Sequence, residues 1–257
     1  MKILGFLCLV TIAGCTSLPA HVFSELHSPA ELKAYNNFWI VNGENASIAD
    51  FPWQASLQSA DSHNCGAVVI SARKAVTAGH CISPGLKIRV GSDNHFEGGK
   101  VFDVSKSTVH PDYGTGAGTF PNDIAVLDFD EDITGDGVKA VEMPTSSSGD
   151  FAGQECTITG WGRTSGGAPL PDVLQKAKTT VLSEADCEAE WGADSINAGH
   201  VCVFNKETGS CNGDSGGPLT CNGVLVGVTS WGAVGCPVSS PSVYTRITHF
   251  LQFIADS

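Results

Sequence analysis

Short apolar runs rich in β-branched residues alternate with turn residues along most of this 257-residue chain. Runs of about four to eight residues bounded by Gly, Pro, Asn or Asp are typical of β-strands. A polar stretch at 144–149 separates a first set of such runs from a second. We expect strands at 51–57, 65–70, 75–78, 87–90 and 124–127 before this stretch, and at 156–160, 175–181, 200–203 and 224–229 after it. The pattern therefore predicts an all-β fold in two halves of about equal size.

Two segments have the pattern of a helix instead. Ser183, followed by acidic residues, is typical of the cap that begins a short helix. At the end of the chain, apolar residues recur at i, i+3, i+4 and i+7, which predicts one amphipathic helix over about 245–256. We expect its apolar stripe to dock on the second half of the molecule; the stripe consists of Ile247, Phe250, Leu251 and Ile254.

The N-terminus begins with Lys2 and an apolar run that is too short to span a membrane, which predicts a secretory signal at 1–17. Cleavage after Ala20 fits as well as cleavage after Ser17. The stretch before Cys15 also resembles a bacterial lipoprotein box, which would give a lipid-anchored protein, but we favour secretion without an anchor. Residues 18–39 are polar and are interpreted as a pro-segment, so the globular part is expected at 40–257.

Charge and cysteine content narrow the class of protein. The chain has 14 basic and 27 acidic residues, a net charge of −13, which argues against nucleic acid or an anionic membrane as partner. An even number of cysteines in a secreted chain predicts disulfides, but spacing alone leaves about 105 pairings of eight cysteines open. The eight that remain after Cys8 and Cys15 are Cys65, Cys81, Cys156, Cys187, Cys202, Cys211, Cys221 and Cys236.

Three residues combine into candidate chemistry. Ser215 lies in the glycine-rich stretch 210–218, but a serine hydroxyl needs a general base and oxyanion donors to act as a nucleophile. His80 follows an apolar run, and Asp123 opens another, where a carboxylate is costly to bury unless it is paired. Each residue alone also fits a structural role: a turn serine, a buried histidine and an aspartate at a strand start.

Taken together, the stretches 77–81 (Thr-Ala-Gly-His-Cys), 122–127 (Asn-Asp-Ile-Ala-Val-Leu) and 213–218 (Gly-Asp-Ser-Gly-Gly-Pro) resemble motifs of the chymotrypsin/trypsin family of secreted serine proteases, chymotrypsin-like subgroup. The resemblance extends from Ile40 to the C-terminus, with a glycine at 79 where alanine is usual. It implies two six-stranded antiparallel β-barrels, at about 40–143 and 144–244, followed by the C-terminal helix. It also implies catalysis by His80, Asp123 and Ser215.

The resemblance implies further roles around the serine. The backbone N–H groups of Gly213 and Ser215 would form the oxyanion hole, and after cleavage of the pro-segment the ammonium of Ile40 would pair with Asp214. The residue before that cut is Trp39 rather than Lys or Arg, so we expect activation by a chymotrypsin-like cut. The implied disulfides are Cys65–Cys81, Cys156–Cys221, Cys187–Cys202 and Cys211–Cys236, which leaves Cys15 without a partner.

The same resemblance places the substrate pocket at Gly209, Ser210, Asn212, Ser230, Trp231, Gly232 and Ser242. Trypsins carry an aspartate where this chain has Gly209, and an uncharged pocket does not compensate the desolvation of Lys or Arg. Gly232 leaves the mouth open and Ser242 narrows the base, so we expect cleavage after Phe, Tyr, Leu or Met. Alternatives are an elastase-like or a broad collagenase-like preference, or an inactive homologue that acts as a binding protein.

We expect no cofactor. We also predict no metal, because Ser92 occupies the first ligand position of the family's calcium loop; the alternative is a calcium ion held through Asp93 or Glu97. Asn45 begins a glycosylation sequon in a surface loop. The expected partners are protein and peptide substrates and protein protease inhibitors, and we expect a monomer outside the cell.

Overall fold

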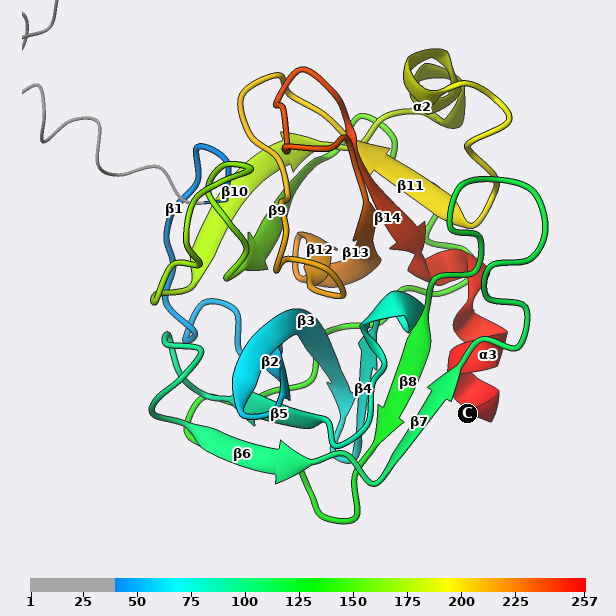
Figure 1. The fold of residues 1–257 in the computed structure, drawn as a ribbon. Helices are drawn as coiled ribbons and strands as arrows, with labels where there is room; N and C mark the ends of the chain where they lie inside the picture. Colours follow the sequence, from blue (N-terminus) through cyan, green and yellow to red (C-terminus); the bar gives the residue numbers. More distant parts are fainter. Residues whose placement is uncertain (1–39) are drawn as a thin grey trace, which may run out of the picture. The chain divides into compact units, whose positions relative to one another are not determined.

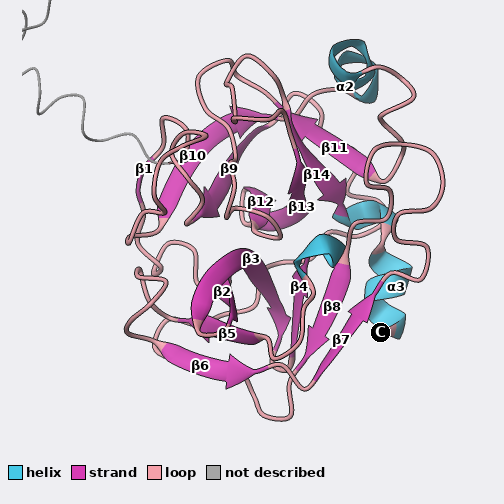
Figure 2. Ribbon diagram, in the orientation of Figure 1, coloured by secondary structure: helices cyan, strands magenta, loops and turns pink. Residues whose placement is uncertain are grey.

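The computed structural model describes residues 40–257 and consists mainly of two antiparallel β-sheets (Figures 1 and 2). The expected signal segment 1–17 and pro-segment 18–39, with Cys15 and Trp39, lie outside the described residues. The expected all-β class is confirmed: one sheet comes from the first half of this region, the other comes from the second half except for one short strand, and a helix ends the chain.

The first sheet closes on itself into a barrel. Its order is β6-β5-β2-β3-β4-β8-β7, so the outer strands are consecutive in sequence. β6 pairs with β5 at one edge of the sheet, and β7, which follows β6 in the chain, pairs with β8 at the other edge. The segment that contains β6 and β7 therefore serves both edges of the sheet. The strands are β2 (Gln54–Ser59), β3 (Ser62–Ser71), β4 (Lys74–Thr77), β5 (Lys87–Val90), β6 (Lys100–Asp103), β7 (Lys106–Val109) and β8 (Ala125–Asp128).

The second sheet has the order β1-β10-β9-β12-β13-β14-β11. Pairing of Val181 with Val203 joins the end of β10 to β11, which closes six of these strands into a second barrel. The short β1 comes from the start of the described chain and flanks β10. The strands are β1 (Glu44–Asn45), β9 (Glu155–Gly160), β10 (Gln175–Thr180), β11 (His200–Val203), β12 (Pro218–Cys221), β13 (Val224–Trp231) and β14 (Ser242–Arg246).

The helices are few and short. α2 (Glu184–Trp191) begins as expected at Ser183, whose hydroxyl accepts the N–H of Asp186. The C-terminal segment starts with a 3₁₀ turn, η3 (Ile247–His249), and continues as α3 (Leu251–Asp256). Another 3₁₀ turn, η2 (Gly79–Cys81), follows β4.

The docking of the C-terminal helix differs from the prediction. Ile247, Phe250 and Ile254 are buried in a cluster that holds Val76 of the first barrel as well as Val228 of the second. In Figure 1 α3 lies beside β7 and β8. The stripe faces both halves because its residues fill the seam between the barrels, and the helix therefore fastens one barrel to the other.

Four disulfides stabilise the described region: Cys65–Cys81, Cys156–Cys221, Cys187–Cys202 and Cys211–Cys236. Each removes conformational freedom from the unfolded chain, which typically contributes about 2–4 kcal/mol to stability. Two of them end at the stretches that carry His80 and Ser215.

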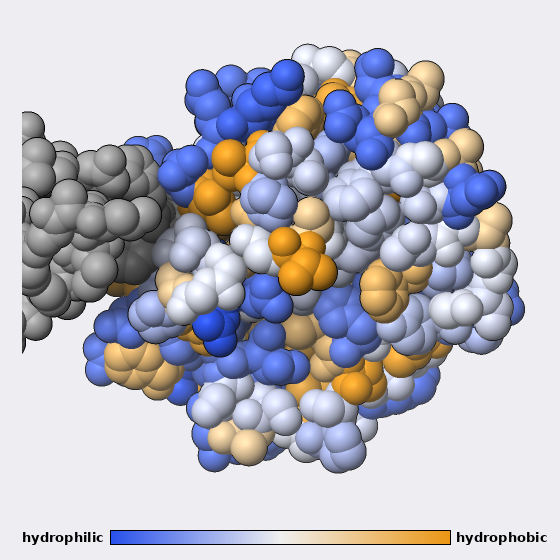
Figure 3. Space-filling view, turned by 45° about the horizontal axis from the view of Figure 1, so that its top comes forward, coloured by the Kyte–Doolittle hydropathy of each residue, from blue (hydrophilic) through white to orange (hydrophobic). Residues whose placement is uncertain are grey.

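The surface and helix lengths agree with a globular protein. On the face drawn in Figure 3, hydrophobic side chains are scattered in small groups among hydrophilic ones. Within residues 40–257, no helix is long and apolar enough to cross a membrane.

A buried hydrogen bond crosses the seam between the barrels. The Thr159 hydroxyl of β9 donates to the Gln54 side-chain carbonyl of β2 at 2.6 Å, and both residues are buried. We expect Thr159→Val to lower the free energy of unfolding by about 1–3 kcal/mol, because it leaves the Gln54 carbonyl buried without its partner. Urea denaturation, in a Ser215→Ala background that prevents self-digestion, measures the change.

Thr159→Val combined with Gln54→Leu is the control for this prediction. The double substitution should cost less than the sum of the single ones, since it removes both polar groups together. Additive losses would show that the two side chains do not interact.

Candidate active site

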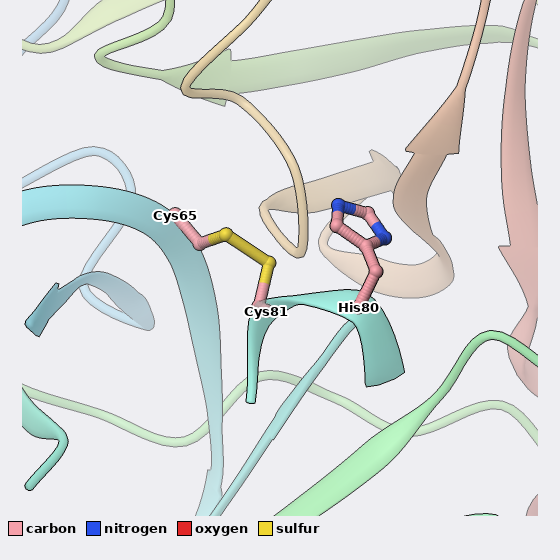
Figure 4. A group of neighbouring side chains, drawn as sticks. All are labelled: Cys65, His80 and Cys81. Atoms are coloured by element: carbon pink, nitrogen blue, oxygen red, sulfur yellow. A yellow bond between two sulfur atoms is a disulfide. The ribbon is translucent and has the colours of Figure 1, made fainter. Parts of the chain in front are cut away.

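His80 is held at the first barrel by its backbone neighbours. It lies on η2, directly after buried strand β4, and Cys81 beside it is joined to Cys65 of β3. Figure 4 shows the imidazole pointing away from this disulfide, toward the ribbon of the second barrel. Because both cysteines are oxidised, they offer no thiolate with which His80 could bind a metal.

Asp123 fixes the orientation of this histidine. Its carboxylate is buried and accepts the His80 Nδ1–H at 2.8 Å and the His80 backbone N–H at 2.9 Å. From the second barrel, the Ser230 hydroxyl donates to the same carboxylate at 2.5 Å, and Thr245 donates to the Asp123 backbone carbonyl at 2.6 Å. A carboxylate cannot donate when ionised, so Nδ1 carries the proton and Nε2 is left as an acceptor.

Ser215 lies in a sharp turn that requires glycine. At Gly216, with φ of 75°, a Cβ would lie 2.1 Å from the Thr77 hydroxyl, so no larger residue fits. The Ser215 carbonyl accepts the Gly66 N–H at 2.7 Å, which fixes the turn against β3. Within residues 40–257 the N–H groups of Gly213 and Ser215 donate to no acceptor, so both remain available to an oxygen atom outside the chain.

One pocket of about 380 Å³ brings the predicted residues together. His80 and Ser215 line it, Asp123 lies buried behind His80, and every predicted substrate-binding residue takes part in its wall. The predicted residues in the wall are Gly209, Ser210, Asn212, Ser230, Trp231, Gly232 and Ser242. No Asp, Glu, Lys or Arg among the described residues lines it, so a charged side chain entering it would meet no opposite charge.

The base and mouth of the pocket have different widths. A Cβ on Gly209 would lie 3.4 Å from the Ser242 hydroxyl, so these two residues face each other closely. That hydroxyl accepts the Ser210 N–H at 3.2 Å, which holds it against the wall. A Cβ on Gly232 would meet nothing within 4 Å, so the mouth is open.

Asp214, next to the serine, is buried without a cation. Its carboxylate accepts the N–H groups of Gly162 and Cys211 at 2.8 and 2.9 Å, and burial raises its pKa to about 7. A Cβ on Gly160 or Gly162 would lie within 2.3 Å of the Asp214 side chain, so glycines make room for it. Among residues 40–257, no basic side chain forms an ion pair with Asp214, and its pKa is shifted by no cation.

Ile40, the residue after the predicted cleavage site, is the first described residue of the chain. Its side chain is buried in the core of the second barrel, and Val41 pairs with Gly209 at the pocket. The φ of Ile40 is 38°, a conformation that a β-branched residue rarely adopts.

Sequence reasoning missed a histidine that supports the serine turn. His63 of β3 is buried, donates from Nε2 to the Gly213 carbonyl at 2.9 Å and accepts the Ser56 hydroxyl at Nδ1. Burial lowers its pKa to about 4, which keeps the ring neutral. The strand alternation that puts His63 on the same buried side as Cys65 was the available signal.

Two exposed apolar residues at the pocket were also missed. Phe120 and Val234 both line it although their side chains are largely open to solvent. Phe120 comes three residues before Asp123, and nothing in the hydrophobic pattern marks either residue as part of a site.

The remaining predicted positions lie elsewhere. Asn45 is exposed, but it belongs to the short strand β1 and not to a loop, and its side chain accepts the Gln175 amide. Ser92 donates to the Glu97 carbonyl, while Asp93 accepts the Ile48 N–H, so both side chains are engaged within the protein.

Comparisons with known proteins agree with this geometry. A sequence model described as "Trypsin" matches residues 40–254. The fibrinolytic enzyme isozyme C of Lumbricus rubellus is 40% identical over 240 residues, which are 85% of this chain and 99% of that protein. A chymotrypsin-like serine proteinase of Haliotis rufescens is 37% identical over 238 residues, 84% of this chain and 90% of that protein. The solved structure of neuropsin, a serine protease expressed in the limbic system of mouse brain, has a TM-score of 0.75 at 31% sequence identity. The match covers 83% of this chain and 97% of the neuropsin chain.

The raised pKa of Asp214 generates a prediction about the uncleaved chain. Between pH 4 and pH 7 the folded protein holds a proton on Asp214 that the unfolded chain has lost, since the ordinary pKa of 3.8 rises to about 7. The contribution of Asp214 to the free energy of unfolding is therefore most favourable in acid and is lost as the pH rises to about 7. We expect the Asp214→Asn substitution to gain stability relative to its parent over that interval, by a few kcal/mol.

Urea denaturation of uncleaved Ser215→Ala protein, with and without Asp214→Asn, at several pH values tests this. His63, with a pKa of about 4, titrates in both proteins and cancels in the difference. A difference in the free energy of unfolding between the two proteins that stays constant from pH 4.5 to pH 7.5 would contradict a raised pKa of Asp214.

Proposed function

Because this chain belongs to the trypsin family of serine proteases, we propose that it is made as a secreted zymogen and cleaves peptide bonds after large apolar residues. It is a serine endopeptidase, and its substrates are proteins or peptides. The observation that carries the finer proposal is the uncharged pocket beside His80 and Ser215.

In the proposed mechanism Ser215 attacks the scissile carbonyl carbon while the unprotonated Nε2 of His80 accepts its proton. The carbonyl oxygen, which becomes negatively charged, accepts the N–H groups of Gly213 and Ser215. Asp123 stabilises the imidazolium, which then gives the proton to the leaving amine. Water repeats the sequence on the acyl-enzyme and regenerates the serine.

The uncharged pocket favours the binding of apolar over basic substrate side chains. Lysine or arginine would lose its hydration there without gaining an ion pair, which costs several kcal/mol. The open mouth at Gly232 admits long or aromatic side chains, while the close approach of Ser242 to Gly209 favours Leu and Met over Tyr at the base. Elastase-like or broad collagenase-like cleavage is the competing proposal, and it would follow if Ser242 narrowed the base further.

Activation by cleavage before Ile40 is supported by two features. Asp214 is a buried carboxylate that lacks a cation, and an ion pair with a new Ile40 ammonium would meet that need. Hydrolysis would also remove the carbonyl that precedes Ile40 and, with it, the crowding caused by the positive φ.

The setting outside the cell is proposed on similar grounds. The four disulfides of the described region favour an oxidising compartment, and the acidic composition favours a freely soluble monomer. Protein protease inhibitors are proposed partners, and Asn45 is a proposed glycosylation site because its side chain is exposed.

A panel of chromogenic peptides that differ only in the residue before the scissile bond tests the specificity. We expect kcat/KM for Phe, Leu or Met to exceed that for Lys and Arg by about 100-fold or more. Gly232→Val should reduce cleavage after Phe by about 100-fold, because its side chain enters the open mouth, and should spare cleavage after Ala.

Gly167→Ala is the matched control for this panel, since its Cβ would meet nothing within 4 Å and Gly167 does not line the pocket. Preference for Lys or Arg would overturn the proposal, and preference for Ala or Val would favour the elastase-like alternative. A protein whose Ser215 fails to react with a phosphonylating reagent after cleavage at Ile40 would be an inactive homologue.

Self-activation has its own test. Full-length Ser215→Ala protein is incubated with active enzyme, and the products are sequenced from the N-terminus. We expect a new N-terminus at Ile40, because Trp39 fits a pocket that accepts large apolar side chains. Trp39→Phe should be processed as well, whereas Trp39→Lys should resist this enzyme and be cut by a trypsin. An intact Trp39–Ile40 bond after prolonged incubation would show that another protease activates the chain.

A further inference from the structure

His200 is a buried histidine outside the catalytic group. It begins β11, is 3% exposed and accepts the Asn197 backbone N–H at Nδ1, at 3.2 Å. Burial lowers its pKa, so the ring is neutral at pH 7. Since Nδ1 is an acceptor, the proton is on Nε2, which faces the backbone carbonyls of Thr119 and Phe120 without reaching full hydrogen-bond geometry to any described residue.

The segment around His200 supports the loop 112–120. The Thr119 N–H donates to the Ser195 carbonyl at 2.8 Å, and the Asn197 side chain donates to the Ala117 carbonyl at 2.5 Å. A Cβ on Gly118 would lie 3.0 Å from the His200 ring, so the two pack closely. Three glycines of this loop have positive φ, which indicates a backbone with weak preferences of its own whose position depends on these contacts.

Phe120 and Trp231, on two sides of His200, both line the active-site pocket. Phe120 closes the loop and lines the pocket with its ring half open to solvent. On the other side, the edge of the His200 ring faces Trp231 at 6.0 Å between centroids, and Trp231 lines the same pocket. The His200 imidazole therefore lies between two walls of the substrate site and contacts neither Ser215 nor His80.

We propose that His200 is a positioning residue that sets where Phe120 and Trp231 stand, and thereby how tightly the enzyme binds the substrate side chain next to the scissile residue. Phe120 comes three residues before Asp123, which holds the His80 ring, and it lines the same pocket as His80. With the scissile side chain at Gly209 and the scissile carbonyl at Ser215, the preceding side chain of the substrate would meet the Phe120 wall. The inference rests on serine protease activity and does not depend on which scissile residue the pocket prefers.

The test measures kcat and KM separately with peptides that keep the best scissile residue and vary the one before it. His200→Leu keeps the apolar volume and removes both the acceptor of the Asn197 N–H and the polar Nε2 edge that faces the Thr119 and Phe120 carbonyls. We expect KM to rise about fivefold for peptides with a large apolar residue at the varied position and to change little for glycine there. We expect kcat to stay within about twofold, because the catalytic group is not touched.

Two further variants separate positioning from general structure. His200→Gln keeps a donor toward the Thr119 and Phe120 carbonyls and should restore most of the lost binding. In a Phe120→Ala background, His200→Leu should add little, since the wall through which it acts is gone. His249→Leu is the matched control, because His249 is exposed and does not line the pocket.

Active enzyme is counted in every sample by phosphonylation of Ser215, so a loss of folded protein is not mistaken for weaker binding. If His200→Leu does not fold, His200→Gln and Phe120→Ala decide the question. A fall in kcat as large as the rise in KM for every peptide would overturn the proposal. So would an effect of His200→Leu that is undiminished in the Phe120→Ala background. Failure of Ser215 to react in the unsubstituted enzyme would instead contradict the protease mechanism.

Discussion

Burial of the Asp123 carboxylate between the two barrels is the constraint on which the site depends. A charge removed from water must be compensated by several donors, and neither barrel supplies enough alone. The first barrel gives the carboxylate the ring and backbone N–H groups of His80, and the second gives it the Ser230 hydroxyl, while Thr245 donates to the Asp123 backbone carbonyl. The same bonds that stabilise the carboxylate therefore set the orientation of the histidine and the registration of one barrel on the other.

Asp214 presents the same problem with a different solution. Among residues 40–257 two backbone N–H groups donate to it, and neither carries a full charge. Its raised pKa expresses this deficit, and glycines at 160 and 162 leave the room that its side chain occupies. In the proposed activation, this incompletely satisfied carboxylate would make the shape of the neighbouring turn depend on the arrival of a cation.

The sequence was informative where the chain is buried or chemically constrained. The runs at 87–90 and 200–203 became strands with the predicted bounds, because their side chains alternate or are fully buried. β6 and β7 were missed because they are largely exposed and polar, and their pairing is decided by barrel closure. The C-terminal stripe was recognised, but periodicity reports which residues are buried and not what covers them. That is why its position across both barrels was not foreseen.

The layer behind the active site was missed for a related reason. His63 and His200 have no motif around them. The carbonyl that His63 contacts is brought near only by the fold, whereas His200 accepts a backbone N–H from three residues earlier in the chain. Their burial has a common consequence: it keeps both rings neutral, so that one nitrogen of each can accept while the other is available to donate. A neutral imidazole can thus join two segments that are distant in sequence without placing a second charge beside the catalytic histidine. In this structure His63 does so for the turn that carries Ser215, whereas His200 lies in the corresponding position behind the loop that carries Phe120.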